Sequence, residues 1–155
     1  MRTVRPLREE DAAQFALIRR ESLLESPLSF AASAATDVAR WSDGVIGAFE
    51  DERLVGIVGV LQARHEKSRH KAHVWGMYVL PAFRNRGIGA ELLDAALRHV
   101  RSLAGVSTVH LSVTSAAPAA RHLYERAGFE VWGVEPDALR HAGDSVDEYH
   151  MALRL

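Results

Sequence analysis

The stretch RNRGIGAELL, from Arg84 to Leu93, joins a run of strand-forming residues, Ala72–Leu80, to a helical pattern of apolar residues. A turn that feeds a helix leaves main-chain N–H groups without partners at the positive end of the helix dipole. Gly87 and Gly89 have no Cβ, so a ligand can approach the main chain closely, and two arginines of the stretch add positive charge. The stretch therefore predicts a site for phosphates, and the alternative is a tight turn in which glycine only relieves strain.

Two other phosphate-binding motifs fit this stretch less well. A Walker loop requires Lys followed by Ser or Thr after its last glycine, and here Ala90 and Glu91 follow. A dinucleotide fingerprint requires a third glycine three residues after Gly89, where Leu92 stands.

Composition narrows the remaining classes of protein. The chain has 155 residues and a net charge of −1, and it has no cysteine, which excludes disulfide scaffolds and thiolate chemistry. We expect a single domain over residues 1–155, with neither nucleic acid nor membrane as partner. The charged N-terminus lacks the apolar core of a signal peptide, so we expect a cytoplasmic protein.

The order of expected elements predicts an α+β protein with a mixed sheet of six to seven strands and helices on both faces. A loop with Pro136 and Gly143 is expected between the last two strands. The expected strands are Thr3–Leu7, Val45–Phe49, Leu54–Leu61, Ala72–Leu80, Val106–Thr114, Phe129–Val134 and Val146–Leu155. The expected helices are Arg8–Leu24, Ser29–Trp41, one from Ile88 to near Gly105, and one from Pro118 to Gly128.

Two sequence boxes resemble those of the GNAT superfamily of N-acetyltransferases. Arg84-x-x-Gly87-x-Gly89-Ala90 is similar to the family signature Q/R-x-x-G-x-G/A, and AARHLYERAGF (Ala119–Phe129) is similar to its second box, A-x-x-L-Y-x-x-x-G-F. The resemblance covers essentially the whole chain. It implies the GNAT fold, with the sheet splayed between its fourth and fifth strands and acetyl-coenzyme A in the gap.

The resemblance also implies which residues bind this cosubstrate. The family often has asparagine where Ala117 stands, and Ser115 is the residue that would compensate. The thioester carbonyl would be polarised by a main-chain N–H near Val79. The pantetheine would pair with the backbone of Met77, Tyr78 and Val79, and the pyrophosphate with that of Arg84, Asn85, Arg86, Gly87, Ile88, Gly89 and Ala90.

In the mechanism implied by the resemblance, an amine attacks the thioester directly and Tyr124 protonates the departing thiolate. The alternative for Tyr124 is a core tyrosine on an apolar helix face. His73 falls where the histone-acetylating branch of the family has its catalytic glutamate, so it is a candidate base, and water chains are the alternative. The other candidates near the acceptor are Glu21, Glu25, Glu148 and His150, and Trp75 and Tyr78 are candidate pocket walls.

The expected activity is acetyl transfer to a primary amine of a small molecule, a peptide or a protein N-terminus. A second subunit, in a homodimer, is a further candidate wall of the pocket. No metal is expected, because His65 and His70 belong to a solvated basic loop without a completing carboxylate pattern. The rival interpretations are a catalytically silent coenzyme A-binding sensor and a module that binds nucleotide phosphates.

Overall fold

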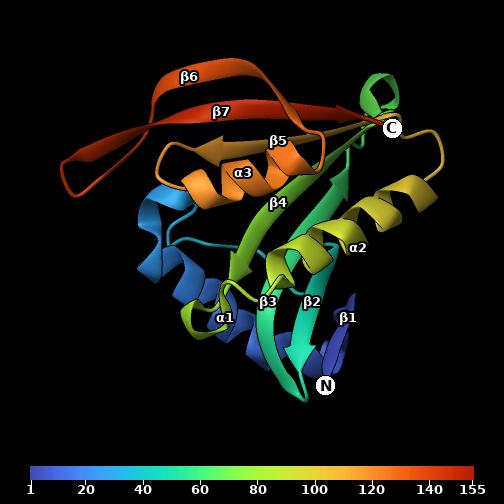
Figure 1. Ribbon diagram of the computed structural model, residues 1–155, viewed down its shortest axis with the longest axis vertical. Helices are drawn as coiled ribbons and strands as arrows, with labels where there is room; N and C mark the ends of the chain where they lie inside the picture. The colour runs from blue at the N-terminus through green and yellow to red at the C-terminus, as the bar shows by residue number, and fades with distance from the viewer.

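A seven-stranded mixed sheet forms the centre of the protein in a computed structural model that describes residues 1–155 (Figure 1). The strand order is β1-β2-β3-β4-β5-β7-β6, and β4–β5 is the one parallel pair. The predicted fold class is confirmed. The strands are β1 (Arg2–Pro6), β2 (Val45–Glu50), β3 (Arg53–Gln62), β4 (Lys71–Val79), β5 (Thr108–Thr114), β6 (Glu130–His141) and β7 (Asp144–Arg154).

Helices cover both faces of this sheet, with α1 behind it and α2 and α3 in front in Figure 1. Helix α2 buries an apolar stripe at helical spacing, and the missing side chain of Gly56 on β3 makes room for it. A Cβ on Gly56 would lie 2.9 Å from Leu92 Cδ1. No helix has the length and apolar character needed to cross a membrane. The helices are α1 (Ala12–Glu25), α2 (Ile88–Ser102) and α3 (Pro118–Arg126).

The sheet opens between β4 and β5. Their pairing covers only three residues of each strand and ends at His73 opposite His110. Farther along β4, the register against β3 shifts between Ile57 and Gly59, and Gly76 has a φ of 65° there. This is a β-bulge, which bends the strand and increases its local twist. The predicted splay between the fourth and fifth strands is confirmed.

The expected helix Ser29–Trp41 is wrong. A single 3-10 turn at Pro27–Ser29 is followed by bends and turns without a helix. The segment has no continuous apolar stripe, and long-range contacts hold it instead. Phe30 and Trp41 pack against the core, and Asp37 pairs with Arg19 of α1.

The expected loop between the last two strands is also wrong. Strand β6 continues past Val134 to His141, and the hairpin turns at Ala142–Gly143, where φ is 50° and 85°. Positive φ at both positions is typical of a tight hairpin turn whose twist matches that of its strands. Pro136 lies where the β6–β7 register shifts, between Glu135 and Leu139, so it removes no regular ladder bond.

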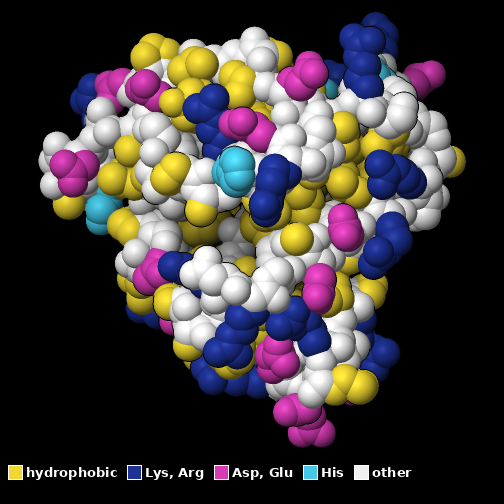
Figure 2. All heavy atoms as spheres, viewed as in Figure 1, with side chains coloured by type: hydrophobic (Ala, Val, Ile, Leu, Met, Phe, Trp, Pro, Cys, Tyr) yellow, Lys and Arg dark blue, Asp and Glu magenta, His cyan; other side chains and the backbone are white.

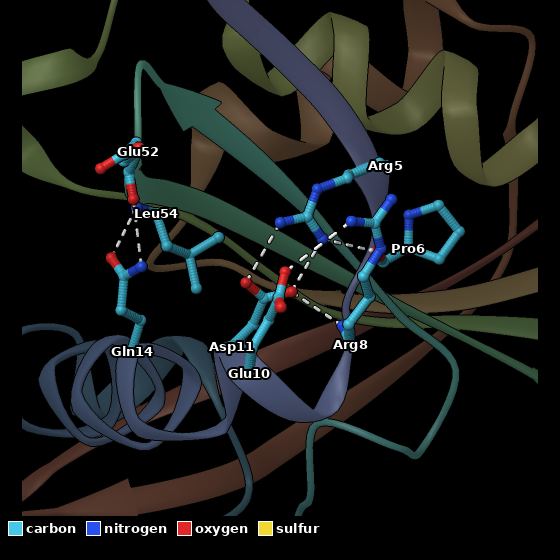
Figure 3. A network of polar contacts seen from close by, with 8 residues as sticks. All are labelled: Arg5, Pro6, Arg8, Glu10, Asp11, Gln14, Glu52 and Leu54. Atoms are coloured by element: carbon cyan, nitrogen blue, oxygen red, sulfur yellow. Dashed lines mark hydrogen bonds and ion pairs between the residues drawn. The ribbon is translucent and has the colours of Figure 1, made fainter.

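A polar network fixes the start of α1 to the sheet (Figure 3). The Asp11 carboxylate accepts hydrogen bonds from the Arg5 guanidinium at 2.7 and 3.1 Å and from the Arg8 N–H at 2.7 Å. One turn later, the Gln14 side chain accepts a bond from the Leu54 N–H at 2.9 Å. The direction of α1, and with it the position of its later side chains, is therefore set by β1 and the β2–β3 hairpin.

Candidate active site

The turn between β4 and α2 presents unpaired main-chain N–H groups to an open space. Asn85 and Gly87 both have left-handed backbone conformations, with φ of 64° and 78°. The ladder of α2 begins with the bond from the Glu91 N–H to the Gly87 carbonyl at 3.1 Å, so the N–H groups of residues 88–90 come before it. A Cβ built on Gly87 would meet no atom within 4 Å. The space in front of these donors suits an anion.

The second glycine of the turn has a different role from the first. A Cβ on Gly89 would lie 3.3 Å from Leu123 Cδ2 of α3. Gly89 therefore lets α2 approach α3 closely. This contact places the start of α2 beside the helix that carries Tyr124.

Arg84 turns away from the open space of the turn. Its Nε donates to the Val79 carbonyl at 3.0 Å, its Nη2 pairs with Glu25 at 2.9 Å, and its guanidinium lies 5.4 Å from the centre of the Tyr78 ring. Glu25 therefore has a cationic partner already and is a weak candidate for a base. Arg86 lies over the Phe83 ring at 5.2 Å and stays at the turn.

Tyr124 lies in the core at the inner side of α3. Tyr124 is only 6% exposed, and its ring meets that of Phe129 edge-on, with the ring centroids 6.0 Å apart. Burial raises the pKa of the Tyr124 phenol, so the group stays protonated at neutral pH and can donate a hydrogen bond. This placement is compatible with both interpretations, the core tyrosine and the proton donor.

The bulge at Gly76 places Trp75 and Tyr78 on the same face of β4, although a regular strand would put residues three apart on opposite faces. The Trp75 ring lies 5.6 Å from the Arg19 guanidinium carbon of α1, and Tyr78 meets Phe30 edge-on at 6.4 Å. We call this surface, which continues onto β5, β7 and β6, the α1-side face.

Two histidines meet on this face where β4 and β5 still pair. The ring centroids of His73 and His110 lie 5.7 Å apart. Partial burial, with the positive charge of Lys71 as a second cause, lowers the pKa of His73. Partial burial, followed by His73 itself, lowers the pKa of His110. Both imidazoles are therefore neutral near pH 7 and able to accept a proton.

A second titratable group lies farther across the α1-side face. His150 Nδ1 is 2.9 Å from Ser112 Oγ, and His150 Nε2 is 3.3 Å from Glu135 and 3.9 Å from Glu148. The ligand atoms of the three titratable residues lie within 4.8 Å of one another, a spacing that could hold a metal ion. The two glutamates face each other across β6 and β7, where like charges are unfavourable without a cation between them.

The remaining predicted residues lie around these groups. Ser115 is tied to β7, because its N–H donates to the Asp147 carbonyl at 2.9 Å and its Oγ accepts from the Asp147 N–H at 3.2 Å. Glu21 is exposed on α1. Burial, and then the charges of Glu25 and Glu21, raise the pKa of Tyr78 to about 12.

Sequence reasoning missed five residues of this region. The isolated glycine at position 76 was a usable signal, because glycine inside a strand often marks a bulge. No local pattern pointed to the others, which reach the region through tertiary contacts. The missed residues are Arg19, Phe30, Gly76, His110 and Glu135.

The surface between α3 and α2 is hollowed above the separation of β4 and β5, with hydrophobic side chains inside and basic ones near the rim (Figure 2). Two further cavities lie outside this hollow, the first between α1 and residues 34–41 and the second over β5, β6 and β7. One of about 340 Å³ is lined by Arg19 and Trp41, and one of about 590 Å³ by His110 and Trp132. Neither includes the residues of the β4–α2 turn.

Comparison with known proteins agrees with this geometry. Residues 7–129 match the model of the acetyltransferase (GNAT) family. The mycothiol acetyltransferase of Propionibacterium freudenreichii is 42% identical over 66 residues, which cover 43% of this chain and 21% of that protein. N-alpha-acetyltransferase 40 of Saccharomyces cerevisiae is 37% identical over 100 residues, which cover 59% of this chain and 35% of that protein.

Solved structures share the same fold. The structure of yncA from Salmonella typhimurium, described as a putative acetyltransferase with its cofactor acetyl-CoA, has a TM-score of 0.86 at 20% identity. The match covers 100% of this chain and 94% of that one. The family model, the boxes at Arg84 and Tyr124 and the splayed sheet all agree: this chain belongs to the GNAT family of acetyltransferases.

Proposed function

We propose that this protein transfers the acetyl group of acetyl-coenzyme A to a primary amine of a small molecule or to the N-terminus of a protein or peptide. The observation that carries the proposal is the turn at Asn85–Gly87, whose free N–H groups face open space beside the splay of β4 and β5. A diphosphate suits these donors, because a side chain at Gly87 would occupy the space in front of them.

Beyond the turn, β4 offers a strand edge for the pantetheine. Pairing with β5 ends at His73, so the backbone of Met77 and Tyr78 has no strand partner on that side. Tyr78 pairs with Ile57 of β3 and Arg84 already occupies the Val79 carbonyl, which leaves Met77 and the Val79 N–H as the groups that would make the strand-like bonds. Ser115, which is bonded to Asp147, is the weakest member of the proposed binding set.

Acetyl-coenzyme A supplies an activated acyl group whose C–S bond breaks as the amine forms a C–N bond. Tyr124 donates its proton, or a hydrogen bond, to the thiolate that leaves. Its raised pKa keeps the phenol protonated until that moment. The contact between Gly89 and Leu123 brings the helix of Tyr124 against the turn at Asn85–Gly87, which we call the diphosphate turn. The proton donor and the proposed diphosphate site are therefore parts of one packed unit.

The base that takes the proton of the amine belongs to the α1-side face. His73 is our first choice, because it lies where the splay begins and its lowered pKa leaves it neutral. His110, whose ring lies beside that of His73, is the nearest alternative base. His150, together with Glu148, is a second alternative on β7.

The decisive experiment is release of free thiol from acetyl-coenzyme A with a panel of primary amines, each product being identified by mass. Turnover with at least one amine is expected, and binding of acetyl-coenzyme A without turnover of any amine would favour the rival sensor function. Binding of ATP that coenzyme A does not displace would favour a nucleotide-phosphate module instead.

A further inference from the structure

Two buried polar atoms lack any hydrogen-bond partner, and both lie on the α1-side face. They are Arg19 Nη1 and Tyr78 Oη. Their residues are 8% and 4% exposed. Unpaired buried donors are rare in folded proteins because they lose water without a replacement, and such a group needs an ordered water, an ion or a ligand as its partner.

The Arg19 guanidinium is held so that one nitrogen remains free. Its Nε and Nη2 donate to the two oxygens of Asp37 at 3.0 and 3.2 Å. The cation also lies beside the rings of Phe30 and Trp75, with 5.9 and 5.6 Å to their centroids. Salt bridge and rings fix the orientation, so Nη1 points in one direction with both of its protons unused.

That direction is toward the bulge of β4. A Cβ on Gly76 would lie 3.2 Å from Arg19 Nη1, so the missing side chain is what admits the guanidinium. Tyr78, two residues along, meets the Phe30 ring that also lies near Arg19. Arg19 and Tyr78 therefore both pack against Phe30 beside the bulge where β4 leaves β5.

We infer that Arg19 Nη1 and Tyr78 Oη bind an oxygen of the acceptor, which carries a carboxylate or carbonyl next to its amine. This chemistry is an α-amino acyl group, either a free amino acid or the first residue of a peptide. The inference rests on the proposed acetyl transfer. The inference requires Phe30, which follows the 3-10 turn Pro27–Ser29, to move and admit this oxygen.

The charges of the site agree with an oxygen ligand rather than a second cation. Asp37 is already paired with Arg19, and Glu25 is paired with Arg84, so neither carboxylate is free to bind a cation, and the remaining carboxylate that acts on Tyr78, Glu21, is exposed on α1. The free groups are a cationic N–H donor and a phenol, which bind oxygen atoms well. A site with such buried donors discriminates strongly against a ligand that lacks the oxygen.

The test compares three amines of equal side chain: phenylalanine, phenylalaninamide and phenethylamine. We expect kcat/KM for one of the first two to exceed that for phenethylamine by about tenfold or more. Preference for the acid identifies free amino acids, and preference for the amide identifies peptide N-termini. Equal kcat/KM for all three would overturn the inference while leaving acetyl transfer intact.

Two variants assign any preference to these atoms. Arg19→Lys keeps a positive charge beside Asp37 but loses the planar guanidinium and its Nη1 donor. Tyr78→Phe removes the unpaired hydroxyl and keeps the ring against Phe30. Both are expected to bring the ratio of kcat/KM values toward one, and Arg19→Lys should do so with the affinity for acetyl-coenzyme A unchanged. Tyr149→Phe, which removes a hydroxyl elsewhere, is the matched control and should keep the ratio. A ratio unchanged in both site variants would overturn the inference.

A binding measurement keeps the two proposals separate. If no amine is acetylated, acetyl transfer fails, and the inference is judged by calorimetry with phenylalanine and phenylalaninamide in the presence of coenzyme A. Binding to the wild type that falls about tenfold in Tyr78→Phe would support the oxygen site. No binding, or equal binding to the variant, would overturn it.

Discussion

Tyr124 is the side chain whose chemistry depends most on its surroundings. Its ring packs against Phe129 as a core residue would, yet its hydroxyl belongs to the helix that Gly89 brings against the diphosphate turn. A phenol with a raised pKa is a poor acid in water but a good hydrogen-bond donor to a developing thiolate. In the proposed mechanism one side chain serves packing and chemistry together, and only the loss of its oxygen separates the two roles.

Tyr124→Phe should lower kcat by about 100-fold or more, the lower range for loss of a positioned proton donor. The affinity for acetyl-coenzyme A should change little, because the ring and its contact with Phe129 remain. Steady-state kinetics and calorimetry on the variant, with Tyr149→Phe as control, make the comparison. Wild-type kcat in Tyr124→Phe would remove the acid assignment and leave the core role.

His73 should set the acidic limb of the rate profile. A base works when neutral, and its lowered pKa means that kcat/KM falls only as the pH drops below the usual value of about 6.5. His73→Ala should abolish that limb, whereas His99→Ala on the exposed end of α2 should leave it in place. If the limb survives in His73→Ala, the base is another group, and His110 and His150 are the next to replace.

The strand–turn–helix unit of β4 and α2 does two things with two glycines. Gly87 provides the left-handed turn and open space, whereas Gly89 provides the contact with α3. The bulge at Gly76 then divides β4 into a part that pairs with β5 and a part that is free on that side. Anion site and strand edge thus lie on consecutive parts of one element.

Gly87→Glu should weaken binding of acetyl-coenzyme A by about tenfold or more, because a carboxylate would fill the anion site. The matched control is Gly105→Glu, since Gly105 has the same φ of 78° and equally open space around it. Both variants suffer the same backbone strain, so calorimetry isolates the effect of position. Equal affinities for the two variants would contradict the proposed diphosphate turn.

The start of α1 should make stability depend on pH. The Arg5 guanidinium lowers the pKa of Asp11, which is buried. Asp11→Asn should therefore lose about 1.5–3 kcal/mol of unfolding free energy at pH 7, the range for a hydrogen bond to a charged group. Because the folded pKa lies below the unfolded value of about 3.9, this difference should shrink as the pH falls below about 4.

Urea denaturation of the two proteins between pH 7 and pH 3 measures the difference. Asp94→Asn, on the exposed side of α2, is the control and should change stability little at any pH. A loss in Asp11→Asn that stays constant over this range would show that the Arg5–Asp11 pair does not control it.

Across the protein, the splay divides the sheet into two parts joined mainly by three paired residues of β4 and β5. One part carries β1 to β4, and the other carries β5, β7 and β6. A ligand that lies in the gap contacts both parts, and it binds only the folded state. Its binding should therefore stabilise the protein as a whole.

At a concentration 100 times its Kd, acetyl-coenzyme A should add about 2.7 kcal/mol of stability, which raises Tm by about 5–10 °C for a chain of this size. Differential scanning fluorimetry measures the shift. Gly87→Glu should reduce it to about half or less at the same concentration, and ATP should give a smaller shift than acetyl-coenzyme A, because it lacks the pantetheine. An equal shift with ATP would contradict a site that extends along β4.

Much of the fold was predictable from local signals. Runs of β-branched residues, the helical spacing after Ile88 and the glycines that close elements placed all seven strands and three helices, with ends displaced by a few residues. The expected helix at Ser29–Trp41 was wrong because ion pairing and aromatic packing decide that segment. The expected end of β6 at Val134 was wrong because the β6–β7 hairpin passes Pro136 through an irregular register.

The sequence by itself determined the glycine turn between β4 and α2, where we propose the diphosphate binds, and the helix of Tyr124, since each depends on residues close to one another in the chain. Only the tertiary structure decided the α1-side face. His110, His150 and Glu135 meet there through the register of β5, β7 and β6, and Arg19 reaches Gly76 only because α1 packs over the bulge. Such contacts join distant positions, and no local period of the sequence encodes them.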